Sequence, residues 1–201
     1  MDHQLRIQHN PIHYAVLFLL AVQWGRVLPM PILNQSVCNS ALPLTEILQH
    51  EASQLLDNYV LIHQFQADSI PEDVPDAKVN GNSPAEKLYS IAVQEMRFYQ
   101  HLMVVKNYTT DFWANPDPSL QDAFETAIKR LSKHYQMIGE LLNAVDPNFN
   151  SPTMPASPAP SIEGGYANKH YGWGVLSNLK VLLNNVEQEL KSVCGEELQN
   201  L

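Results

Sequence analysis

The stretch QADSIPEDVPDAKVNGN, residues 66–82, separates two segments of helical pattern and is long for a connection in a helical protein. Its prolines, glycine and acidic side chains are typical of a loop. Extended over about 18 residues, such a loop covers about 60 Å. A helix of about 22 residues measures only about 33 Å, so this connection can return along the full length of a helix.

Four segments predict helices, because their apolar residues recur at intervals of three, four and seven. They cover about residues 44–64, 84–106, 118–145 and 166–194. Before the second, Ser83 and Glu86 match a capping box, and Pro84 suits the first helical position. No alternation of apolar and polar residues predicts a strand. We therefore expect an all-α protein with one domain, residues 28–201.

The connections predict how these helices follow one another in space. The second connection, about residues 107–117, is short, whereas the third, about 146–165, is long and rich in proline. A simple up-and-down bundle needs only short loops, whereas two long connections allow two helices in a row to point the same way. The pattern predicts a long-chain four-helix bundle, up-up-down-down, with two long crossover loops.

Composition limits the classes of partner. The chain has 201 residues, 45% of them hydrophobic, with 12 Lys and Arg against 21 Asp and Glu, a net charge of -9. Such a chain can bury a sizeable core. Its basic residues form no run, so we expect neither nucleic acid nor an anionic membrane surface as a partner.

The N-terminus matches a secretion signal. Its apolar run YAVLFLLAV, Tyr14–Val22, is shorter than the roughly 20 residues of a membrane-spanning helix and has the length of a signal-peptide core. We predict a signal peptide at residues 1–27, cleaved between about 22 and 30, and a secreted, extracellular protein with no membrane insertion. A buried first helix is the alternative, which Pro29 and Pro31 disfavour because prolines break helices.

Secretion changes the meaning of four other residues. Cys38 and Cys194 are the only cysteines, and an oxidising compartment permits a disulfide. In the predicted topology both lie at one end of the bundle, just before the first helix and near the end of the last; two free thiols are the alternative. Asn34 in NQS and Asn107 in NYT are candidate N-glycosylation sites.

The last predicted helix begins with an unusual density of aromatic residues, in EGGYANKHYGWGVL, residues 163–176. The predicted topology brings Tyr166 and Trp173 to the same end as Phe112 and Trp113 of the second connection. Clustered aromatics with a neighbouring cation, here Lys169, are typical of a protein-binding hot spot. The alternative is that Trp173 packs inward and Tyr166 only stabilises the helix start.

Two stretches carry a family resemblance. ILQHEASQLLDNYVLIHQF, residues 47–65, and GGYANKHYGWGVLSNLKVLLNNV, residues 164–186, resemble the first and last helices of the interleukin-6 group of long-chain cytokines. The resemblance spans about residues 44–193 and is strongest to the branch of leukaemia inhibitory factor, ciliary neurotrophic factor and cardiotrophin, including its fish macrophage-expressed form. Family members carry Phe-x-x-Lys at the start of the last helix; here Tyr166 replaces the phenylalanine and Lys169 matches.

The resemblance implies a monomeric, secreted ligand with growth-factor activity in immune responses. It implies a receptor of the glycoprotein 130 type on the first and third helices. It also implies a receptor of the leukaemia inhibitory factor type at Tyr166 and Lys169.

Two other classes of function fit the sequence less well. A di-metal enzyme in a helical bundle needs Glu-x-x-His pairs, and none precedes His63, His101, His134 or His170; a loose zinc site formed by these histidines is the alternative. Enzyme motifs such as H-E-x-x-H, C-x-x-C and G-x-S-x-G are missing as well, so we expect no catalysis, cofactor or metal.

A secreted helical-bundle carrier of lipid or a small apolar ligand is the second alternative. The acidic chain lacks the basic helix faces of lipid binders.

Overall fold

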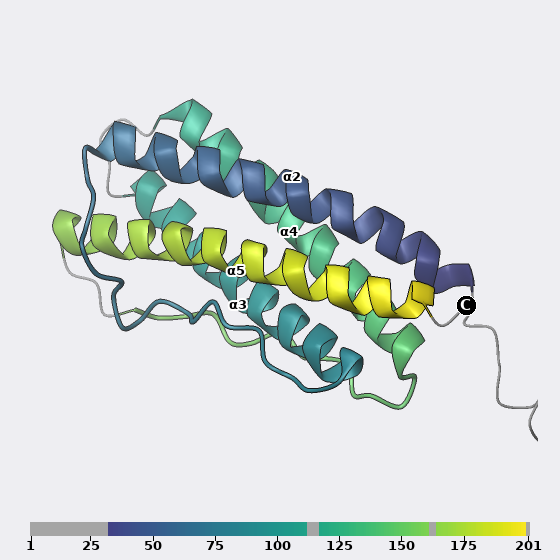
Figure 1. Cartoon of the computed structure of the whole chain (residues 1–201). Helices are drawn as coiled ribbons and strands as arrows, with labels where there is room; N and C mark the ends of the chain where they lie inside the picture. Colours follow the sequence, from purple (N-terminus) through teal and green to yellow (C-terminus); the bar gives the residue numbers. More distant parts are fainter. Residues whose placement is uncertain (1–31, 112–116, 161–163, 200–201) are drawn as a thin grey trace, which may run out of the picture. The chain divides into compact units, whose positions relative to one another are not determined.

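The computed structural model describes residues 32–111, 117–160 and 164–199, without the side chains at 32–34, 111 and 196–199. This part contains four helices and no strand, which confirms the predicted all-α class with a four-helix bundle (Figure 1). The helices are α2 (Ile32–His63), α3 (Pro84–Asp111), α4 (Pro118–Val145) and α5 (Gly165–Gln199). The predicted signal peptide, Phe112 and Trp113 lie outside the described residues.

Each helix packs against two others, since α2 and α3 both contact α4 and α5. Between α2 and α5, Cys38 is bonded to Cys194, whereas Tyr59, later in α2, donates a hydrogen bond to the carbonyl of Lys169, earlier in α5. The same opposite order of residue numbers holds between α2 and α4, α3 and α4, and α3 and α5. Every helix is therefore antiparallel to both of its neighbours.

The core between the helices is apolar, and all of the described helices contribute to it. Fully buried side chains include Tyr59 of α2, Phe98 of α3, Phe124 of α4 and Leu182 of α5. Burying a side chain of this size is worth about 1.5–3 kcal/mol, so this core is the main source of stability.

The starts of α3 and α4 follow from capping. Glu86 accepts hydrogen bonds from the backbone amides of Asn82 (2.8 Å) and Ser83 (3.2 Å), and the Ser83 hydroxyl accepts one from the Glu86 amide. These bonds hold the pKa of Glu86 below its usual value, and the bonds from the backbone amides contribute most to this shift. Asp117 caps α4 by accepting from the amides of Ser119 and Leu120. Both helices begin where the sequence predicts.

The predicted start of the first helix near residue 44 is wrong, because α2 begins at Ile32 and runs through Pro43. Cys38 therefore lies inside the helix rather than before it. Proline removes one helical hydrogen bond and normally breaks a helix. Here Pro43 lies on the exposed side of α2, where water can satisfy the carbonyl that loses its donor.

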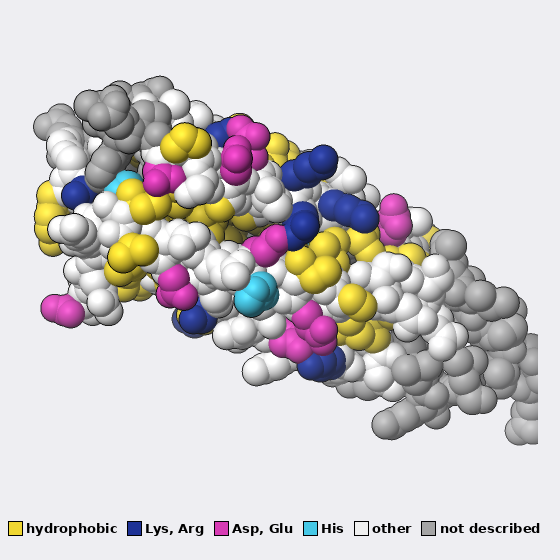
Figure 2. All heavy atoms as spheres, turned by 90° about the horizontal axis from the view of Figure 1, so that it is seen from above, with side chains coloured by type: hydrophobic (Ala, Val, Ile, Leu, Met, Phe, Trp, Pro, Cys, Tyr) yellow, Lys and Arg dark blue, Asp and Glu magenta, His cyan; other side chains and the backbone are white. Residues whose placement is uncertain are grey.

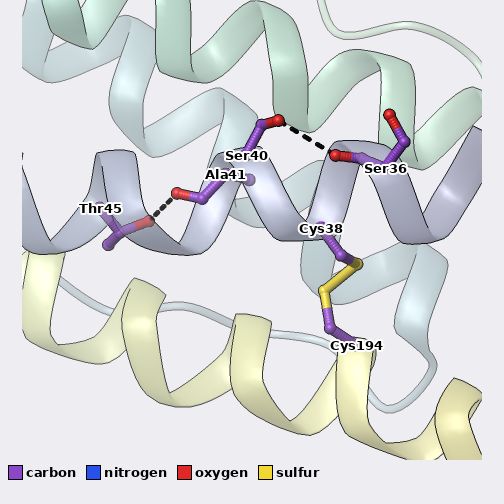
Figure 3. Close-up of a disulfide and its surroundings, with 6 residues drawn as sticks. All are labelled: Ser36, Cys38, Ser40, Ala41, Thr45 and Cys194. Atoms are coloured by element: carbon purple, nitrogen blue, oxygen red, sulfur yellow. Dashed lines mark hydrogen bonds between the residues drawn. A yellow bond between two sulfur atoms is a disulfide. The ribbon is translucent and has the colours of Figure 1, made fainter.

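The disulfide secures the part of α2 that precedes Pro43. The sulfur atoms of Cys38 and Cys194 are 2.10 Å apart, with their Cα atoms separated by 6.0 Å (Figure 3). Both cysteines are buried, as is Ala41 one turn further on. The bond attaches the start of α2 to the last turns of α5, so the first segment of α2 stays packed although the proline weakens its hydrogen bonding.

The long connection at residues 64–83 runs alongside α5. His170 donates to the carbonyl of Ser69 (2.8 Å), and two asparagines of α5 hold the rest of the loop. Asn178 donates to the carbonyl of Pro75 (3.0 Å) and Asn185 to that of Ala77 (2.9 Å). The loop therefore runs in the direction of α5 over several turns, as its trace in Figure 1 shows, and it reaches α3 only after covering that side of α5.

A polar network lies at the centre of the bundle. His134 of α4 is fully buried and places Nε2 2.7 Å from the Thr45 hydroxyl of α2 and Nδ1 2.7 Å from the Glu95 carboxylate of α3. The Thr45 hydroxyl donates to the carbonyl of Ala41, so its oxygen accepts from Nε2. Acceptors on both ring nitrogens require an imidazolium. Burial opposes this charge, but the adjacent Glu95 carboxylate outweighs burial and raises the pKa of His134.

Replacing His134 tests this network. His134→Ala leaves the Glu95 carboxylate buried without its partner, which should cost about 3–5 kcal/mol of unfolding free energy. His50 is an exposed histidine of α2, and His50→Ala should change stability by less than about 0.5 kcal/mol. Urea unfolding measures both changes.

The unfolding free energy should depend on pH with a defined sign. A raised folded pKa means that the contribution of His134 is complete below the ordinary value of 6.5 and is lost as pH rises through the folded value. The unfolding free energy of the wild type should therefore fall on the alkaline side, and His134→Ala should lack this fall. An equal alkaline fall in both proteins contradicts the network.

Candidate functional site

An aromatic cluster lies where α2 ends and α5 begins. Tyr166 is 71% exposed, and its ring meets the edge of the Phe65 ring at a centroid distance of 5.3 Å. His170 lies 6.0 Å from Tyr166 and 6.1 Å from Phe65, and it stacks on Trp173 at 6.4 Å. We call these four residues the aromatic end.

Further apolar side chains are exposed near the aromatic end. Leu61, in the last turn of α2, is 75% exposed, and its neighbour Ile62 is 36% exposed. Ile70, in the following loop, is also exposed. Figure 2 shows hydrophobic side chains reaching the surface at this end, at the left of the view. Exposed aromatic and aliphatic residues gathered in one place are typical of a protein-binding surface.

Lys169 has a structural use that its sequence position does not reveal. Its ammonium donates a hydrogen bond to the carbonyl of His63, the last residue of α2, at 3.1 Å, and its side chain is half-buried. A cation at this point satisfies a terminal carbonyl and complements the negative end of the helix dipole. Lys169 therefore joins the start of α5 to the end of α2, and its charge lies beside the aromatic end.

Two histidines beneath the aromatic end, the buried His63 and the half-buried His101, are held neutral. Burial, followed by the charge of Lys169, lowers the pKa of His63 to about 4. Burial, followed by Arg97, lowers the pKa of His101 to about 4. Neutral His101 shares a hydrogen bond with the Tyr171 hydroxyl, with 2.6 Å between Nδ1 and the hydroxyl oxygen, and burial raises the pKa of that hydroxyl. At neutral pH neither histidine therefore adds a positive charge to this end of the bundle.

The two glycines around Trp173 permit close packing. A methyl group at Gly172 would lie 2.3 Å from the Tyr59 hydroxyl, and one at Gly174 would lie 2.6 Å from Pro71 of the long loop. The missing side chain at Gly172 therefore allows α2 to approach α5 closely, and the missing side chain at Gly174 allows the long loop to do so. Between them, Trp173 is half-buried against the core and stacks on His170, which makes it a support of the aromatic end rather than its exposed tip.

The structure thus brings together three of the predicted binding residues, Tyr166, Lys169 and Trp173. Phe65, Leu61 and His170 were missed by the sequence reasoning. A signal for Leu61 and Phe65 existed in LIHQF, residues 61–65, where apolar residues continue past the stripe that faces the core.

Of the two candidate glycosylation sites, the structure describes the surroundings of Asn107 but not those of Asn34. Asn107 is exposed on α3, whereas Thr109 of the same sequon is buried, donates to the Lys106 carbonyl and accepts from Gln121. A transferase must therefore reach this sequon before α3 folds. The Asn34 side chain lies outside the described residues.

The described part of the chain also limits metal sites and membrane spans. Residues 32–111, 117–160 and 164–199 contain no group of three His, Cys, Asp or Glu side chains placed to hold a metal ion. In the same part, none of the helices has both the length and the apolar character needed to cross a membrane. No protein-family model matches the chain, and no curated protein sequence is similar enough to count as a relative.

The close approach at Gly172 can be tested against a second helical glycine. Gly172→Ala forces α5 away from Tyr59 and should cost about 1–3 kcal/mol of unfolding free energy, as overpacked cores do. Gly139 of α4 has open space where its methyl group would lie, so Gly139→Ala should stabilise by about 0.5–1 kcal/mol through helix propensity. Urea unfolding of both variants checks the pair, and equal effects would contradict the packing.

Proposed function

We propose that this protein is a secreted cytokine of the interleukin-6 group. It would activate cells by assembling receptors of the glycoprotein 130 type and of the leukaemia inhibitory factor receptor type. The observation that carries the proposal is the exposure of Tyr166 at the start of α5, with Phe65 against its ring. A tyrosine held at a helix start loses little conformational freedom on binding, and aromatic anchors of this kind contribute much of the affinity of protein interfaces.

The proposal includes an up-up-down-down course of the bundle with two crossover loops. The antiparallel order of all the neighbouring helix pairs supports it. In that course α2 and α3 point the same way, and α4 and α5 point back. The long connections at 64–83 and 146–164 provide the length that it requires.

The two receptors would bind at separate places. We assign the leukaemia inhibitory factor receptor type to the aromatic end, with Lys169 at its border. The glycoprotein 130 type would bind the face formed by α2 and α4, where Gln54, Asn58 and Asp122 line an open hollow. These three side chains are exposed and can pair with a partner.

Secretion agrees with the disulfide. A structural disulfide persists in oxidising compartments, and both cysteines are buried, which shields them from reductants. The carrier of lipid or a small apolar ligand remains the competing proposal; a carrier would be purified with bound lipid, whereas a cytokine would not.

Replacing Tyr166 tests the receptor assignment. Tyr166→Ala removes an exposed ring, so stability should stay near wild type. Affinity for an ectodomain of the leukaemia inhibitory factor receptor type should fall by about 2 kcal/mol or more, close to thirtyfold. Affinity for the glycoprotein 130 type should be unchanged. Surface plasmon resonance with both ectodomains measures this, alongside a signalling assay.

Val181 supplies the matched control, since it is an exposed apolar residue of α5 outside the aromatic end. Val181→Ala should bind both ectodomains as the wild type does. Lys169→Ala should weaken binding and also lower stability by about 0.3–1 kcal/mol, because it removes the cation from the end of α2. Full signalling by folded Tyr166→Ala would refute the assignment.

Glycosylation of Asn107 is also part of the proposal. Asn107→Gln should lower the mass of the protein secreted by cultured animal cells by the mass of one N-linked glycan. Asn143 is an exposed asparagine of α4 outside any sequon, so Asn143→Gln should leave the glycan in place. An unchanged glycan mass in Asn107→Gln means that the site is unoccupied.

A further inference from the structure

The proline-rich connection before α5 has a regular spacing. In SPTMPASPAPS, residues 151–161, prolines stand at 152, 155 and 158, and a fourth follows at 160. Residues 150–160 belong to no helix, strand or turn. A spacing of three matches the repeat of the polyproline II helix, in which every third residue lies on the same side.

Burial follows the same period as far as Pro158, and Pro160 is half-buried as well. Pro152, Pro155 and Pro158 are half-buried, whereas Ser151, Thr153 and Ser157 are exposed. The segment is fastened at its beginning, because Phe149 packs against the Tyr89 ring of α3 at a centroid distance of 5.4 Å. One side of the extended chain is thus partly covered, and the hydroxyl-bearing residues lie on its two other sides.

These three hydroxyls also differ from those of the two buried threonines of the helices. Thr45 and Thr109 donate to backbone carbonyls within their helices. In contrast, Ser151, Thr153 and Ser157 make no hydrogen bond to any residue of the described part. Their oxygens are accessible on an extended backbone that cannot become helical, because prolines flank them.

We propose that Ser151, Thr153 and Ser157 are acceptors for O-linked glycosylation of the mucin type, whose substrates are serine and threonine among prolines in secreted chains. The inference rests on the proposed secretion. In the transfer, the hydroxyl oxygen attacks the anomeric carbon of a nucleotide-activated N-acetylhexosamine. A carbon–oxygen bond forms, the bond from that carbon to the diphosphate breaks, and the nucleoside diphosphate leaves. The hydroxyl proton passes to a base of the secretory-pathway transferase or to the departing phosphate.

The site would serve the binding surface indirectly. This connection leads directly into the start of α5, where Tyr166 lies. Hydrated sugars on residues 151–157 would keep the extended segment apart from other chains, while its prolines stay on the covered side. The aromatic end would then be the exposed apolar surface that remains free of sugar.

The test uses the full chain secreted by animal cells that make mucin-type glycans. After enzymatic removal of N-linked glycans, intact-mass analysis should show increments of N-acetylhexosamine and attached sugars, and electron-transfer fragmentation should place them on Ser151, Thr153 or Ser157. A variant with all three changed to alanine should lose every increment. Thr126 is an exposed threonine of α4, and Thr126→Ala should keep them.

A secreted chain without increments overturns the inference, as do increments that persist in the triple variant or that have the mass of phosphate. A second chain, with residues 1–27 replaced by an established secretion leader, passes the transferases even if the natural N-terminus does not export the protein. A bare loop on that chain is decisive against the inference. Receptor capture with the same preparation reports on the proposed function separately, since a glycosylated chain that captures neither receptor type contradicts only that proposal.

Discussion

The buried contact between Glu95 and His134, extended by Thr45, is the constraint on which the arrangement of the bundle depends. It joins α3, α4 and α2 at one level of the core. Apolar side chains alone tolerate sliding of one helix past another, because most of the buried area is recovered after a slip. A slip of one turn here would separate the imidazolium from the carboxylate inside the core, and an uncompensated buried charge costs several kcal/mol. The polar contact therefore fixes the relative heights of these helices, whatever its net contribution to stability.

The height of the remaining helix, α5, relative to α2 is fixed by the disulfide and by Gln49 of α2, which donates to the Leu183 carbonyl at 3.0 Å.

With these heights fixed, the end of α2 and the start of α5 meet at a level set by the rest of the bundle. Tyr59 then reaches the carbonyls of the first turn of α5, and Gly172 leaves the space that this approach requires. Lys169 closes the joint by donating to the carbonyl of His63. The exposed ring of Tyr166 is consequently carried by a packed joint and not by a free chain end. A surface that is already ordered before binding loses less entropy when a partner covers it.

The sequence predicted local features well and long-range polar contacts poorly. Both ends of α4 could be placed, because Pro118 follows a capping aspartate and the apolar stripe stops at Val145. The start of α2 could not, because a proline is a strong local stop signal, and only the structure shows that Pro43 lies on the exposed side of a continuous helix. Glu95 and His134 each look like an ordinary polar residue of a helix, and only the packing of the helices makes them partners. The role of Lys169 was hidden for the same reason, since its acceptor is a backbone carbonyl that no side-chain pattern marks.

The long loop limits where a partner can bind. Asn178 and Asn185 lie on the side of α5 that a polar pattern would assign to solvent, yet both donate to carbonyls of residues 64–83. Val74 and Ala77 of that loop are buried against the bundle. This side of α5 is therefore covered by the protein's own chain, and its amide side chains are already used. A partner that approached along it would have to displace a loop held by several hydrogen bonds.

The start of α5 is different, because the loop leaves α2 beside it and Tyr166 projects beyond the covered region. That difference is the physical reason for proposing one receptor contact at the start of α5 rather than along its side.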